Sequence, residues 1–148
     1  MTCVGALGIA LALTGCGRPG MDITADDGRD STAQSASRAE CPISLPKAGL
    51  CARLSWDKGP SADLPEGSAF TVRFWKAGAP ETLLDPTQAL SSYARMVCCG
   101  SIAAARVDRV ALGIFSVTGL KLVPGKWDVV LQLKGAGLVE KALVRVEL

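Results

Sequence analysis

The stretch PGKWDVVLQL, residues 124–133, decides the fold class of this chain. Apolar side chains recur in it at every second position, which predicts a β-strand with one buried face and one solvated face. Pro124 and Gly125 are typical of the turn that leads into such a strand. The buried phase consists of Trp127, Val129, Leu131 and Leu133.

Similar segments lie on both sides of this stretch, separated by turns that contain Gly and Pro. Clear alternation marks residues 50–57, 70–75 and 142–148, and residues 91–98, 104–110 and 113–122 are strand-like but less regular. Asp85 to Leu90 is the one segment compatible with a short helical turn. We therefore predict an all-β domain, an immunoglobulin-like antiparallel β-sandwich of about seven strands.

The expected core is built around five aromatic residues: Trp56, Phe70, Phe74, Phe115 and Trp127. Each could also be a platform for a ligand, but three of them lie on the apolar phase of a strand, which favours the core. Trp75 falls on the polar phase beside Phe74. It is either packed under a loop or exposed at a contact surface, and the pattern does not choose between the two.

The amino-terminal residues indicate export. Residues 3–13 form an apolar run that is shorter than the roughly 20 residues of a membrane-spanning helix but fits a signal peptide. The following Leu13-Thr14-Gly15-Cys16 resembles the lipobox of bacterial lipoproteins, in which the cysteine carries the lipid and the signal is removed before it. The alternative is an apolar helix that belongs to the fold, with Cys16 an ordinary buried thiol.

The resemblance divides the chain into a lipoprotein signal peptide (1–15), a lipidated Cys16 with a disordered tether (16–40) and the β-sandwich domain (41–148). The tether lacks aromatic residues and is rich in small polar ones, so it cannot bury enough surface to fold. We expect a protein of the bacterial cell envelope, anchored in the membrane by covalent lipid. Gly17 after the cysteine is compatible with the outer membrane, facing the periplasm or the cell surface.

Composition excludes several classes of function. The formal net charge is only +2, and no basic cluster predicts binding to nucleic acid. The chain contains no histidine, which removes imidazole metal sites and the usual nucleophile–base pairs. We therefore expect no enzymatic activity and no conventional cofactor.

Three segments resemble a known group of exported proteins. LCARLSW (50–56), FTVRFWK (70–76) and LVPGKWDVVLQL (122–133) together are similar to the YtkA-like and FixH-like β-sandwich proteins. Members of that group often carry a segment with Met and His of the type Met-Pro-x-Met-Gly-His-Gly, and some are linked to copper handling. The resemblance implies the same sandwich for residues 41–148.

The matching segment here is Met96-Val97-Cys98-Cys99-Gly100-Ser101, in which the Pro, the second Met and the His of the group are missing. Met96, Cys98 and Cys99 supply soft thioether and thiolate ligands that suit Cu(I). Adjacent side chains on a strand point to opposite faces, so both thiols reach one ion only if the segment bends. The alternative is that both thiols are structural.

Cys41 and Cys51 are the candidate disulfide, which would close a small loop at the start of the domain. The four cysteines of the domain allow three complete pairings, so links to Cys98 or Cys99 stay open. The acidic residues Asp57, Asp63 and Glu66 are interpreted as a solvated loop.

Two functions follow as expectations. The first is a non-enzymatic interaction module that contacts another envelope protein, with structural cysteines and an exposed apolar patch near Trp75. The second is a copper-binding module, which requires that Met96, Cys98 and Cys99 converge and that both thiols are reduced.

Overall fold

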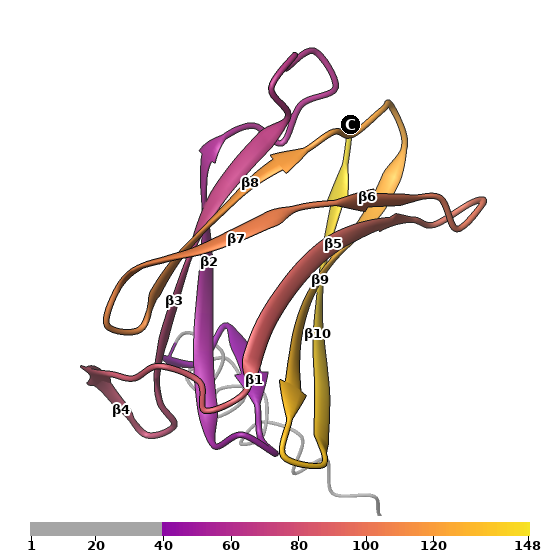
Figure 1. The fold of residues 1–148 in the computed structure, drawn as a ribbon. Coiled ribbons are helices and arrows are strands. Elements are labelled where there is room, and N and C mark those ends of the chain that lie inside the picture. Colours follow the sequence, from indigo (N-terminus) through magenta and orange to yellow (C-terminus); the bar gives the residue numbers. More distant parts are fainter. Residues whose placement is uncertain (1–39) are drawn as a thin grey trace, which may run out of the picture.

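The computed structural model describes residues 40–148, which form a sandwich of two antiparallel sheets (Figure 1). The first sheet has the order β1 (Ile43–Leu45), β2 (Leu50–Lys58), β3 (Ser68–Lys76), β8 (Ile114–Leu120) and β7 (Arg106–Ala111), and β4 (Ala79–Leu83) pairs with β3. The second sheet has the order β10 (Leu138–Glu147), β9 (Lys126–Gly135), β5 (Ala89–Met96) and β6 (Ile102–Ala104). The predicted all-β sandwich is confirmed.

The described part of the chain has ten strands rather than about seven. The three additional strands are β1, β4 and β6. Two of them have only three residues each, and β4 contains Pro80 and is mostly exposed, so neither length nor alternation marks them in the sequence.

The helical turn considered for Asp85 to Leu90 is wrong, because residues 84–88 are irregular and β5 begins at Ala89. The Asp85 carboxylate accepts hydrogen bonds from the Gly113 amide at 2.7 Å and from Arg109 at 2.8 Å. These two contacts tie the link between β4 and β5 to the turn between β7 and β8. Asp85 is therefore held by a distant hairpin and does not take part in a local helical turn.

The core lies between the facing sides of β3 and β9. Phe70, Val72 and Phe74 of β3 are fully buried. The rings of Trp56 and Phe115 are half-buried and pack edge-on against this row: the centroid of Trp56 lies 5.1 Å from that of Phe70, and that of Phe115 lies 5.7 Å from that of Phe74. From β9 the core receives Trp127, Val129, Leu131 and Leu133. Asp128 and Val130 on the opposite face are buried as well, so the solvated second face expected for this strand is wrong there.

The two sheets are joined along both sides. On one side the chain runs from β6 directly into β7, with only Ala105 between them, and so passes from one sheet to the other (Figure 1). On the other side Glu140 of β10 is buried, and its carboxylate accepts hydrogen bonds from the amides of Lys47 at 3.0 Å and Ala48 at 2.9 Å. Lys47 and Ala48 lie in the turn between β1 and β2, so this carboxylate connects the two sheets.

Candidate functional site

Residues 96–101, which we call the sulfur turn, connect β5 to β6. The Met96 amide donates to the Ser101 carbonyl at 2.8 Å, and the Gly100 amide donates to the Met96 carbonyl at 2.9 Å. Gly100 has a φ of 73°, a conformation that favours glycine. The segment is therefore a closed bend, the geometry that lets neighbouring side chains reach one point.

The bend brings the predicted sulfur ligands together. Cys99 Sγ lies 3.5 Å from Met96 Sδ and 3.3 Å from Ser101 Oγ. Cys98 and Cys99 are both unpaired, exposed thiols. Cys98 is the neighbour of Cys99 in the same turn, and the pKa values of the two thiols influence each other.

The absence of a side chain at Gly125 leaves space for the Met96 thioether. A Cβ atom at Gly125 would lie 2.6 Å from Met96 Cε, so any side chain there would displace the thioether. The amide of Val97 also donates to the Lys126 carbonyl at 2.9 Å. The Pro124-Gly125 turn that precedes β9 therefore also packs against the sulfur turn.

The two thiols are not equivalent. The pKa of Cys99 is lowered, first by the Ser101 hydroxyl and then by the Ser101 backbone and Cys98, all of which hydrogen-bond to the thiolate. The pKa of Cys98 is raised, first because its hydrogen bond with Cys99 retains the proton. Cys99 is therefore the thiol that ionises first and the stronger candidate for a metal ligand or nucleophile.

The spacing of the sulfurs is close to that of a shared metal ion. Two sulfur ligands that each lie about 2.3 Å from one ion are separated by roughly 3.8–4 Å, against the 3.5 Å between Met96 Sδ and Cys99 Sγ. Across residues 40–148, no group of three or more His, Cys, Asp or Glu side chains has metal-binding geometry. A site with three sulfur ligands in the sulfur turn would need the Met96 thioether in addition to the two thiolates.

The structure pairs Cys41 with Cys51, with the sulfur atoms 2.03 Å apart. Cys51 lies on the outer face of β2, directly across from Trp75 of β3, and both residues are buried. Trp75 is only 6% exposed, so of the two alternatives for this ring the covered one holds. The apolar contact surface expected around Trp75 is not formed by its ring.

The acidic residues 57, 63 and 66 do not form a site. Asp57 accepts a hydrogen bond from Thr71 at 2.8 Å, and Glu66 forms an exposed ion pair with Lys58 at 3.6 Å. These partners are typical of a solvated surface.

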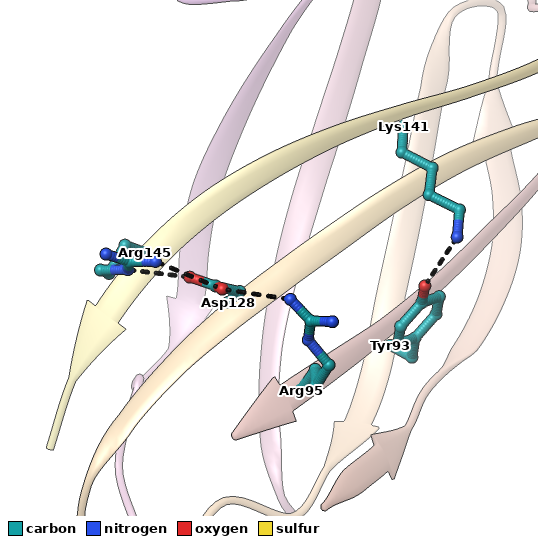
Figure 2. A network of polar contacts seen from close by, with 5 residues as sticks. All are labelled: Tyr93, Arg95, Asp128, Lys141 and Arg145. Carbon is teal, nitrogen blue, oxygen red and sulfur yellow. Dashed lines mark hydrogen bonds and ion pairs between the residues drawn. The ribbon is translucent and has the colours of Figure 1, made fainter. Parts of the chain in front are cut away.

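One polar cluster was not predicted. Asp128 is buried on the outer face of β9, where Arg145 of β10 donates to both of its oxygens, at 2.9 and 3.3 Å, and Arg95 of β5 lies at 3.9 Å (Figure 2). The hydrogen bonds from Arg145, and the positive charges of both arginines, lower the pKa of Asp128. Beside it, Lys141 donates to the hydroxyl of Tyr93 at 3.4 Å. The only signal for this cluster in the sequence was an acidic residue, Asp128, inside an apolar strand. Its arginine partners could not be identified because they depend on the strand register.

Cys16, the predicted lipidation site, lies outside the described residues, together with the whole of segment 1–39. Within the described part, no helix is long and apolar enough to cross a membrane. Comparison of the chain with known protein families, with curated proteins and with solved structures finds no match.

Proposed function

We propose that this protein is a lipid-anchored, non-enzymatic binding module of the bacterial cell envelope, and that its sulfur turn binds a soft metal ion, Cu(I). The observation that carries the metal part of the proposal is the approach of Cys99 Sγ to within 3.5 Å of Met96 Sδ, in a turn where Cys98 and Cys99 are both unpaired, exposed thiols. Soft thioether and thiolate ligands select Cu(I) over harder cations.

The geometry favours this reading over that of a simple interaction module. That alternative expected the cysteines to have a structural role, but Cys98 and Cys99 are exposed and make no disulfide. It also expected an apolar patch at Trp75, which is buried. A partner in the envelope remains part of the proposal, as the molecule that delivers or receives the ion.

The ligands have distinct roles in this proposal. Cys99, whose pKa is lowered, would be the first thiolate available to a soft metal ion. Cys98, whose pKa is raised, would be the second thiolate ligand. Met96 completes the set without a proton to lose. The missing histidine of the YtkA-like and FixH-like pattern is replaced by thiolates, which suit reduced copper.

The lipid anchor rests on the sequence Leu13-Thr14-Gly15-Cys16 and on the polar residues that follow it. Acylation at Cys16 would place the domain within the length of a short flexible tether from the membrane surface. The outer membrane is the proposed site, because Gly17 follows the cysteine.

Native mass spectrometry of the full-length protein, purified anaerobically from membranes, tests both parts. The wild type should carry a lipid mass on Cys16 and retain one Cu(I) in competition with a Cu(I) chelator. Cys98→Ser and Cys99→Ser should lose the ion, and Met96→Leu should hold it more weakly than the matched Met21→Leu. Copper retained by a Cys98→Ser, Cys99→Ser double variant, or none retained by reduced wild type, would contradict the metal site.

A further inference from the structure

The outer face of the first sheet contains a pocket that is separate from the sulfur turn. Its volume is about 300 Å³. It is lined by residues of β2, β3 and β4, which lie on the left side of Figure 1, whereas the sulfur turn belongs to the other sheet. The residues around it are Glu40, Arg53, Arg73, Trp75, Pro80 and Leu83.

Two arginines form the polar wall of this pocket. Arg53 of β2 and Arg73 of β3 are directly opposite each other in the antiparallel ladder. Like charges in directly opposed positions destabilise a sheet. Two guanidinium groups that line one cavity from facing positions can both contact a bound anion, which would also lessen their mutual repulsion. With Glu40 included, the three charged side chains leave the pocket with a net charge of +1.

The remaining wall is apolar and firmly held. Trp75 forms part of it, and the guanidinium carbon of Arg53 lies 5.9 Å from the centroid of the Trp75 ring. This contact is within the range of cation–π attraction and orients Arg53 on the pocket side of the ring. Pro80 and Leu83 of β4 complete the apolar surface, and Leu83 is directly opposite Trp75 in the ladder.

The disulfide shapes the same pocket. Cys41 is bonded to Cys51, which lies across the ladder from Trp75. Glu40, the residue before Cys41, is thereby held at the pocket. The bridge therefore fixes one wall of a cavity as well as the start of the domain.

We propose that this pocket binds a small organic anion, a carboxylate or phosphate monoester that carries an apolar group. The guanidinium groups of Arg53 and Arg73 hold the anionic end, since arginine matches the planar oxygens of carboxylate and phosphate. The apolar group lies on Trp75, Pro80 and Leu83. The volume is at the lower limit of ordinary ligand pockets, so the ligand is small.

Side-chain NMR of the ¹⁵N-labelled full-length protein in phosphatidylcholine nanodiscs tests this site. The probes are phenylacetate, phenyl phosphate and the neutral 2-phenylethanol. We expect saturable shifts of the Trp75 indole and the Arg53 guanidinium signals with one or both anions, and none with the alcohol at the same concentration. Whichever of phenylacetate and phenyl phosphate binds more tightly shows whether the pocket prefers a carboxylate or a phosphate.

Arg73→Gln should weaken binding roughly ten- to a hundredfold. Because Arg73 is exposed, its replacement should leave the melting temperature close to that of the wild type, which separates lost binding from lost fold. The control is Arg106→Gln, on the same face of the same sheet but outside the pocket, where Arg106 pairs with Asp108 at 2.7 Å; it should bind as the wild type does. Equal binding by Arg73→Gln and the wild type, or equal shifts with the neutral alcohol, would overturn the proposal, as would the absence of any saturable shift.

Discussion

Replacement of Glu140 by alanine tests how the two sheets are held together on the side of β1 and β10. Glu140 is only 7% exposed, and its carboxylate accepts hydrogen bonds from the amides of Lys47 and Ala48 at 3.0 and 2.9 Å. A hydrogen bond to a charged group contributes about 1.5–3 kcal/mol when its loss leaves the partner unsatisfied. Lys47 is exposed and Ala48 half-buried, so water replaces part of each bond.

We therefore expect Glu140→Ala to lower the free energy of unfolding by about 2–3 kcal/mol, less than the sum of two such bonds because water compensates for part of the loss. Glu140→Gln keeps one acceptor oxygen without the charge, so it should lose about half as much. At roughly 4–8 °C per kcal/mol for a domain of this size, the alanine variant should melt about 10–20 °C below the wild type.

The assay is urea unfolding of the full-length protein, followed by tryptophan fluorescence, with amide hydrogen exchange at Lys47 and Ala48 as a local measurement. The matched control is Glu147→Ala on the same strand, where an exposed ion pair with Lys126 at 3.6 Å is lost. That loss should be no more than about 1 kcal/mol. If Glu140→Ala is no more destabilising than Glu147→Ala, and exchange at the two amides is unchanged, the carboxylate does not join the sheets.

Two further predictions concern the turns and the outer face. Gly113 has a φ of 65°, and an added Cβ would lie 2.7 Å from the Phe74 carbonyl oxygen; Gly113→Ala should therefore unfold at lower urea than Gly78→Ala, where φ is also positive but the space is open. The gap should be at least about 1 kcal/mol, and equal midpoints would show that the close approach has no cost. Asp128 has a folded pKa below its ordinary value of 3.8, so the stability that it contributes is present at neutral pH and is lost as the pH falls through 3.8 toward that lower value. Asp128→Asn should accordingly be less stable than the wild type at pH 7, and a difference that stays the same in urea unfolding near pH 3 would contradict this assignment.

The sulfur turn shows which parts of a site could be predicted from the sequence and which could not. Met96, Cys98 and Cys99 were named because of their ligand chemistry, and the condition that the segment must bend followed from the two-residue period of strands. That Gly125 makes room for Met96 could not be predicted, because the contact joins two turns that are close only after β5 pairs with β9.

The two arginine sites illustrate the same limit. Arg53 and Arg73 are 20 residues apart and become a pair only through the β2–β3 register. Asp128 meets Arg95 and Arg145 through the registers of β5 and β10 against β9. A shift of one residue in any of these ladders would turn the side chains to the opposite face.

The sequence by itself determined the longer strands and the residues that point into the core, since alternation such as that of Trp127, Val129, Leu131 and Leu133 is a local property of the chain. It also determined the soft chemistry of the sulfur turn and the absence of imidazole. Only the tertiary structure decided that Trp75 is buried, that Glu140 joins the sheets and that Arg53 and Arg73 line one pocket. The physical reason is that burial, hydrogen-bond partners and charge pairs depend on residues far apart in the chain, and these meet only once strand order and register are set.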